Sequence, residues 1–179
     1  MLTLNFTPFP ALTTQRLILR QLAPEDEEAI FALRSNEQVN HFLGRTPAQS
    51  MEDARLFIQK INKGIQNNEC LYWAITLKED AQLIGTMSLW NISPETGMAE
   101  IGYELLPPYQ GKGFMQEAFS TVIEYVFGTL QLQTIEAWSR ADNARSIKLL
   151  EKNHFTMKEL LSEPNMAVYI LNRELYQKL

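Results

Sequence analysis

The sequence holds one cysteine and two histidines among its 179 residues. The single Cys70 permits no internal disulfide and is consistent with a reducing cytoplasm. Because large hydrophobic residues follow it at 71–73, we expect Cys70 to be a buried small hydrophobe and not a nucleophile. His41 and His154 lie far apart without metal-ligand spacing, so the sequence predicts no zinc site.

The chain also lacks an excess of positive charge and a long apolar run. Its formal net charge is −5, which argues against a general nucleic-acid-binding protein, because such a protein needs a basic face to neutralise phosphates. The negative charge leans toward a cationic acceptor, through weak steering. No apolar run approaches the length of a membrane span, and residues 1–6 lack the pattern of a secretory signal. We therefore expect neither membrane association nor secretion.

What is present fits one globular α/β domain over residues 1–179, because the length and the hydrophobic share of 45% are ordinary for such a domain. Apolar periodicity predicts strands over 12–22, 71–77, 83–92, 99–106, 133–140, 155–160 and 167–175. It predicts helices from Pro24, over 50–67 with a capping pattern at Ser50 and Asp53, over 118–127, and from Asn143. Residues 35–50 are expected to be irregular.

The order of these elements predicts the sheet. Three successive strands before residue 107 form an antiparallel meander, and the helix over 118–127 allows the strands on either side of it to lie parallel. The predicted fold is therefore a mixed, mostly antiparallel sheet with one central parallel pair, flanked by helices.

The segment 107–115, Pro-Pro-Tyr-Gln-Gly-Lys-Gly-Phe-Met, joins a strand to a helix. Gly111 and Gly113 let the backbone approach a ligand without a Cβ, and free N–H groups at a positive helix end can bind an anion. Lys112 and Gln110 add a charge and an amide. No Lys followed by Ser or Thr is present, which excludes a kinase-type phosphate loop. A tight turn that holds no ligand is the alternative.

The residues around this loop resemble the GNAT acetyltransferases, particularly the RimJ/RimL-like branch. The similarity rests on Ala-Glu-Ile-Gly-Tyr at 99–103, Gln-Gly-Lys-Gly-Phe-Met-Gln-Glu-Ala at 110–118, Arg-Leu-Ile-Leu-Arg at 16–20 with Asp26, and Asp-Asn-Ala-Arg-Ser at 142–146. The family's loop has Gln or Arg, two residues, Gly, one residue, then Gly or Ala. Here Met115 stands at the last position, a departure that leaves its backbone N–H available.

The resemblance implies acetyl-CoA as cosubstrate, in a gap where the strand at 99–106 splays from the next parallel strand. The pyrophosphate would bind the loop backbone, the pantetheine arm would pair with the strand, and an N–H near Leu105 would polarise the thioester. Asn143 would cap its helix and touch pantetheine. The predicted cofactor-binding residues are Leu105, Leu106, Gln110, Gly111, Lys112, Gly113, Phe114, Met115 and Asn143.

Two residues are predicted to move protons. Period-two alternation places Glu100, Gly102 and Glu104 on one face of the strand. In the wider family an acidic residue on this strand often accepts the amine proton, and Glu100 matches it best, with Glu104 as the alternative. Ser146 lies three residues after Asn143 on the same helix face, and RimL-like enzymes carry a serine near the departing sulfur, where it can protonate the thiolate. Pairing of Glu100 with a neighbouring strand and plain capping at Asn143 are the structural alternatives.

These features predict acetyl transfer from acetyl-CoA to a primary amine by direct attack in a ternary complex. A protein or peptide N-terminal α-amine, or a small amine, suits a weak base better than lysine, whose deprotonation near neutral pH needs roughly 4 kcal/mol. Four aromatic side chains are candidates for the acceptor pocket or for the core: His41, Phe42, Trp90 and Tyr103. A CoA-binding regulatory module without turnover, or a structural interaction domain, are the alternatives. The sequence names neither the acceptor nor the oligomeric state, and it is compatible with a homodimer.

Overall fold

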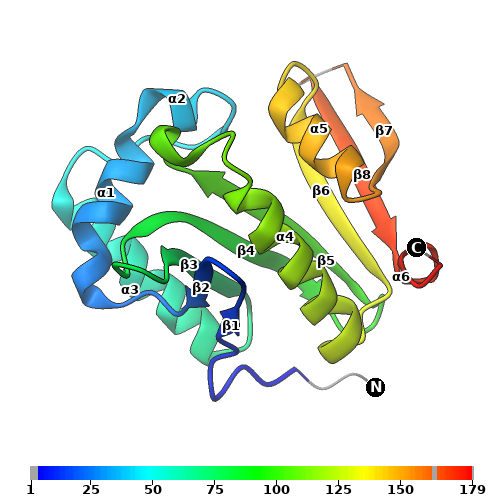
Figure 1. Ribbon diagram of the computed structural model, residues 1–179, viewed down its shortest axis with the longest axis horizontal. Helices are drawn as coiled ribbons and strands as arrows, with labels where there is room; N and C mark the ends of the chain where they lie inside the picture. The colour runs from blue at the N-terminus through cyan, green and yellow to red at the C-terminus, as the bar shows by residue number, and fades with distance from the viewer. Residues whose placement is uncertain (1–3, 163–164, 179) are drawn as a thin grey trace.

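The computed structural model describes residues 4–162 and 165–178, and its strands form one eight-stranded sheet. The strand order is β1-β2-β3-β4-β5-β6-β8-β7, and β5 with β6 is the parallel pair. This confirms the predicted mixed sheet (Figure 1). The strands are β1 (Leu12–Thr13), β2 (Leu17–Arg20), β3 (Leu71–Leu77), β4 (Leu83–Ser93), β5 (Met98–Leu105), β6 (Thr134–Arg140), β7 (Thr156–Leu161) and β8 (Met166–Asn172).

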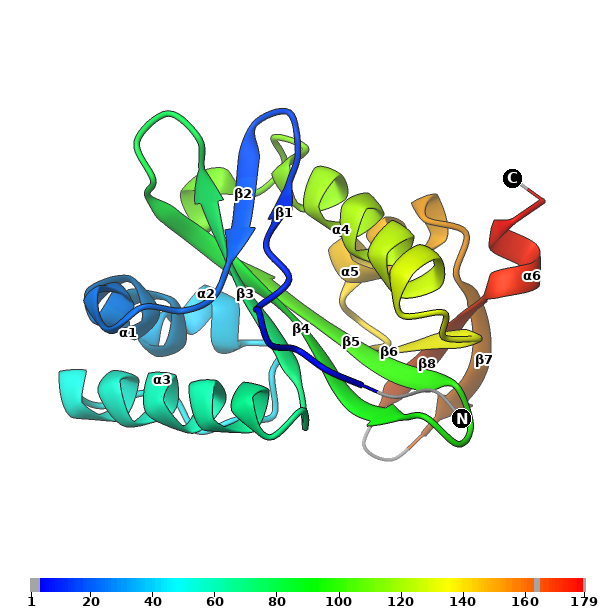
Figure 2. The same cartoon turned by 90° about the horizontal axis from the view of Figure 1, so that it is seen from below.

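Helices cover both faces of the sheet, with α1, α2 and α3 on one side and α4 and α5 on the other (Figure 2). The helices are η1 (Pro24–Asp26), α1 (Glu27–Ser35), α2 (Glu37–Asn40), α3 (Met51–Gln66), η2 (Pro107–Tyr109), α4 (Phe114–Glu124) with its π-helical continuation η3 (Tyr125–Thr129), α5 (Ala144–Lys152) and α6 (Arg173–Tyr176). At the start of α3, Ser50 and Asp53 form the predicted capping box. In the described part of the chain, no helix is both long and apolar enough to cross a bilayer.

Three predicted boundaries are wrong. The single strand over 12–22 is two short antiparallel strands, because the chain reverses at Thr14, whose N–H donates to the Leu17 carbonyl. The irregular stretch over 35–50 contains α2, which begins where the Asn36 side chain accepts from the Val39 N–H. The last strand ends at Asn172, and a short helix follows it.

The parallel pair is short, and its shortness opens the sheet. β5 and β6 are paired only from Met98 with Thr134 to Glu100 with Glu136. Beyond this point β5 continues beside β4 to Leu105, whereas β6 continues beside β8 to Arg140. The two strands therefore diverge toward the ends at which α4 and α5 begin (Figure 1).

Candidate functional site

A cavity of about 850 Å³ lies beside the end of β5. Its wall is formed by α2 and the loop after it, the end of β5, the glycine loop, the first turn of α4, and α5. Eight of the predicted site residues line it: Leu105, Gln110, Gly111, Gly113, Phe114, Met115, Asn143 and Ser146. The structure therefore brings together residues that lie in three separate parts of the sequence.

The glycine loop presents a row of unused backbone donors. Gly111 and Gly113 have φ angles of 74° and 80°, in the left-handed region that residues with a Cβ rarely adopt. The first N–H of the turn with a backbone acceptor is that of Glu117, which donates to the Gly113 carbonyl. Within residues 4–162 and 165–178, the N–H groups at 111–116 donate to no backbone or side-chain acceptor. The loop thus aims its donors, including that of Met115, at the start of α4, where the helix dipole also favours an anion.

Contacts from the turn between β1 and β2 brace this loop from outside. Arg16 donates to the Lys112 carbonyl and to Glu117, and its guanidinium lies 4.3 Å from the centre of the Phe114 ring. Burial raises the pKa of Glu117, but hydrogen bonds from Thr14 and Arg16 outweigh burial and lower it. The loop geometry is therefore held without any ligand.

The side chain of Gln110 is already engaged. Its amide nitrogen donates to the Leu105 carbonyl at 2.8 Å, and its oxygen accepts from Arg145 at 2.8 Å. Gln110 consequently ties the glycine loop to the end of β5 and to α5. Lys112 does not line the cavity, and its ammonium lies 5.9 Å from the centre of the Tyr109 ring.

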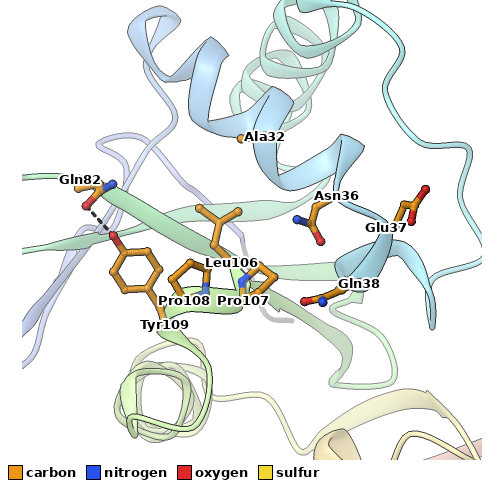
Figure 3. Close-up of a pocket in the computed structure, with 9 residues that line it drawn as sticks. All are labelled: Ala32, Asn36, Glu37, Gln38, Gln82, Leu106, Pro107, Pro108 and Tyr109. Atoms are coloured by element: carbon orange, nitrogen blue, oxygen red, sulfur yellow. Dashed lines mark hydrogen bonds between the residues drawn. The ribbon is translucent and has the colours of Figure 1, made fainter.

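The end of β5 turns free peptide groups toward the opening. The Leu106 N–H donates to the Ile84 carbonyl at 2.8 Å. Since backbone groups alternate in direction along a strand, the N–H groups of Tyr103 and Leu105 point to the other edge, where β6 has moved away. The Leu106 N–H is therefore not free to bind a cofactor. The Leu106 side chain borders a second cavity of about 700 Å³ (Figure 3).

Ser146 meets a tyrosine across the cavity. The hydroxyls of Tyr103 and Ser146 are 2.7 Å apart, and burial raises the pKa of Tyr103 to about 12. The Tyr103 ring packs edge-on against Phe119, with centroids 5.0 Å apart. Asn143 accepts from the Ser146 N–H at 3.2 Å, which confirms that it caps α5.

The two candidate carboxylates have different surroundings. Glu100 does not line the cavity, and it accepts a hydrogen bond from Asn91 at 2.9 Å. Glu104 lines the cavity and is nearly buried, with Oε1 accepting from Thr86 at 3.2 Å and from Tyr72 at 3.4 Å. The geometry thus favours Glu104, the alternative that lies closer to the loop.

Arg45 forms an ion pair with Glu104. Arg45 Nη2 lies 2.7 Å from Glu104 Oε2, at an angle that does not make a hydrogen bond, and Arg45 Nε donates to Asn40. Arg34 stacks on Phe57, with its Cζ 3.8 Å from the ring centre. The carboxylate of Glu104 is therefore paired with one guanidinium, that of Arg45.

Sequence reasoning missed a basic stripe on α5. Arg145, Lys148 and Lys152 all line the cavity. Their i, i+3, i+7 spacing places them on one helix face, and this spacing was the signal that could have identified them.

Comparison with known proteins agrees with this geometry. Residues 16–156 match the family described as an acetyltransferase (GNAT) domain. The uncharacterized N-acetyltransferase YoaA of Bacillus subtilis (strain 168) is 37% identical over 155 residues, which are 87% of this chain and 88% of that protein. The ribosomal-protein-serine acetyltransferase of Escherichia coli (strain K12) is 30% identical over 115 residues, which are 64% and 63% of the two chains.

The fold is also that of a solved CoA complex. RimJ of Mycobacterium smegmatis in complex with CoA-disulfide superimposes with a TM-score of 0.80 at 18% identity, covering 92% of this chain and 87% of that one. At this identity the likeness concerns the fold alone.

Proposed function

The chain belongs to the GNAT acetyltransferase family, and from this premise we propose that it moves an acetyl group from acetyl-CoA to a primary amine by direct attack within a ternary complex. Acetyl transfer to amines is general in the family. The observation that carries the proposal for this chain is the row of unused N–H groups at 111–116, in a loop that borders the cavity between the end of β5 and α5. Residues 1–179 would form a single N-acetyltransferase domain.

Acetyl-CoA suits the groups that line the cavity. Its pyrophosphate would accept from the N–H groups at 111–116, while the basic stripe on α5 would face its remaining phosphate. The pantetheine amides would pair with the outward backbone groups of Tyr103 and with the Asn143 amide. The Leu105 N–H would donate to the thioester oxygen as it gains negative charge.

The reaction needs proton transfer at two places. Glu104 would take a proton from the acceptor ammonium, directly or through water, and the freed nitrogen would attack the thioester carbon. When the tetrahedral intermediate collapses, the carbon–sulfur bond breaks and the nitrogen loses its second proton to solvent. The sulfur would leave facing the Ser146 hydroxyl and receive a proton through it. A thiol pKa of about 8.5 lies far below that of Tyr103, so solvent and not the phenol would replenish Ser146.

A valine at Gly113 is expected to raise the dissociation constant of acetyl-CoA by at least about tenfold. The φ of 80° would strain any residue with a Cβ, and the donors at 111–116 would turn away from the phosphate. Isothermal titration calorimetry on folded protein measures this change. Gly128→Val is the control, because Gly128 has open space around it and no left-handed φ. Unchanged affinity in Gly113→Val would contradict phosphate binding by the loop.

A Cys70→Ala variant is expected to keep its turnover. Cys70 is buried outside the cavity, and burial raises its thiol pKa to about 11, so it is not a reactive thiolate near neutral pH. Double-reciprocal plots of the initial rate, at several fixed acceptor concentrations, should give intersecting lines, as a ternary complex requires. Parallel lines, together with an acetylated Cys70 in the parent protein, would overturn direct attack.

Thiol release decides between turnover and binding alone. A panel of amines and N-terminal peptides is tested with acetyl-CoA, and free thiol is measured. A CoA-binding module without turnover would be stabilised by acetyl-CoA but would release no thiol with any acceptor. A structural interaction domain would not be stabilised at all.

A further inference from the structure

We propose that two copies of this chain form a dimer by pairing their β7 strands in antiparallel orientation, so that the two sheets join into one. The proposal concerns how the chain assembles and does not depend on the proposed function. It follows from the free edge of the sheet and from the residues that this edge presents.

The outer edge of β7 is open to another strand. β7 ends the sheet, and among the described residues it pairs with β8 alone (Figure 1). Apart from that pairing, its backbone at 156–161 bonds to no other backbone group of residues 4–162 and 165–178. At the opposite edge of the sheet β1 has only two residues, whereas β7 has six. Such an edge presents N–H and C=O groups to which a further strand can add.

β7 also carries the two most exposed large hydrophobic side chains in the described part of the chain. Met157 is 57% exposed and Leu160 is 58% exposed. Proteins ordinarily protect a free edge with charged residues, because apolar residues there promote association. The two side chains therefore indicate an edge that a partner covers.

A β-bulge decides the face to which each side chain of β7 points. Lys158 is the extra residue, so that Lys158 and Glu159 together lie opposite the single Val168 of β8. Both charged side chains are thus on one face of the sheet, where Lys158 Nζ bonds to Glu136 of β6 at 2.9 Å. Residues 157 and 160 lie opposite positions 169 and 167 of β8, which are two residues apart, so both point to the other face.

This arrangement makes β7 complementary to itself. In an antiparallel pair centred between positions 158 and 159, Lys158 lies opposite Glu159 of the second copy, and Met157 lies opposite Leu160 of the second copy. A twofold axis normal to the sheet generates each pair twice, and it requires opposite residues to share a face. Without the bulge, positions 158 and 159 would point to different faces and could not pair in this way.

Both kinds of pair stabilise adjacent strands. Opposite charges and apolar side chains that face each other across two strands each contribute to sheet stability. The Lys158 side chain is 51% exposed and has three donors, so its bond to Glu136 leaves it able to meet Glu159 of the second copy. A second copy of this chain is therefore the partner that the edge fits.

Sedimentation velocity over a dilution series measures the association. We expect the parent protein to form a dimer, and we expect Leu160→Lys and Glu159→Lys each to raise the dimer dissociation constant by at least about tenfold, because symmetry alters two pairs at once. Leu56→Lys is the matched control for Leu160→Lys, since Leu56 lies on α3 and is 53% exposed. It should leave the dissociation constant unchanged. All three positions are exposed, so the melting temperatures should stay near that of the parent protein.

Cysteine cross-linking tests which residues face each other. Met157→Cys and Leu160→Cys are made separately in a Cys70→Ala background, mixed to exchange subunits, and oxidised. The mixture should give a disulfide-linked dimer, because directly opposite Cβ atoms lie about 4.5–5.5 Å apart, near the distance that a disulfide spans. Each variant alone should give little, since its two cysteines would be offset by three positions along the strands.

A charged bulge can also protect the edge of a monomer. A parent protein that sediments as a monomer at its highest soluble concentration therefore overturns the proposal, as does a dimer that both lysine variants leave intact. Cross-linking that is no stronger in the mixture than in the single variants also overturns it. If a lysine variant melts at a much lower temperature than the parent protein, the cysteine mixture decides alone. Thiol release is measured separately, so failure of the proposed function leaves these results unaffected.

Discussion

Replacing Glu104 by Gln is expected to lower kcat/KM by about 10²–10⁴-fold while leaving acetyl-CoA affinity near that of the parent protein. Glutamine keeps the shape of the side chain and its hydrogen bonds with Tyr72 and Thr86, but it cannot take a proton from an ammonium group. Since the loop at 111–116 is untouched, cofactor binding has no reason to change. Thiol-release kinetics and calorimetry measure the two quantities separately.

Glu100→Gln is the matched control on the same strand face. Glu100 bonds to Asn91 and lies outside the cavity, so we expect its variant to retain activity within about threefold. A thermal melt of Glu104→Gln is required, because the variant leaves Arg45 without its carboxylate partner. If Glu100→Gln loses activity and folded Glu104→Gln does not, the base lies four residues earlier on β5.

The second large effect is expected at Ser146. Ser146→Ala should lower kcat by about 10²–10³-fold with acetyl-CoA affinity preserved, as is typical when one donor to developing negative charge is removed. The alanine keeps the α5 backbone, so Asn143 can still accept from the N–H at position 146. Single-turnover measurements of thiol release separate this loss from slow product release.

Tyr103→Phe distinguishes a serine that acts on the sulfur from one that is merely packed. With a pKa of about 12, the phenol stays protonated at neutral pH and can donate to Ser146 Oγ, leaving the serine proton free for the sulfur. Loss of this hydroxyl should therefore slow the reaction less than loss of Ser146. If Ser146→Ala retains full activity, the serine has no part in the transfer.

The positions of the charged side chains could be predicted less well than the loop. The glycine loop was recognised because strand, glycines and amphipathic helix are neighbours in the sequence, and local geometry follows from residue type there. Glu100 and Glu104 share one strand face by alternation, so the sequence could not separate them. They differ only because β5 leaves β6 after Glu100, which is a property of the sheet.

Net charge says little about any one region of the surface, for a related reason. A net charge of −5 leans toward a cationic acceptor, but it is an average over the whole surface. Folding nevertheless places Arg45, from the loop after α2, 2.7 Å from the carboxylate of Glu104. Interactions at a few ångströms in a partly buried site outweigh distant charges that solvent and salt screen.

The fold class, the glycine loop and the cap at Asn143 could be predicted from the sequence, because each depends on residues that are close along the chain. Only the packing of the elements brings Ser146 to Tyr103 and places Glu104, and not Glu100, at the cavity. These contacts join residues from different helices and strands. They arise from the pairing and divergence of whole strands, which no local pattern of residues encodes.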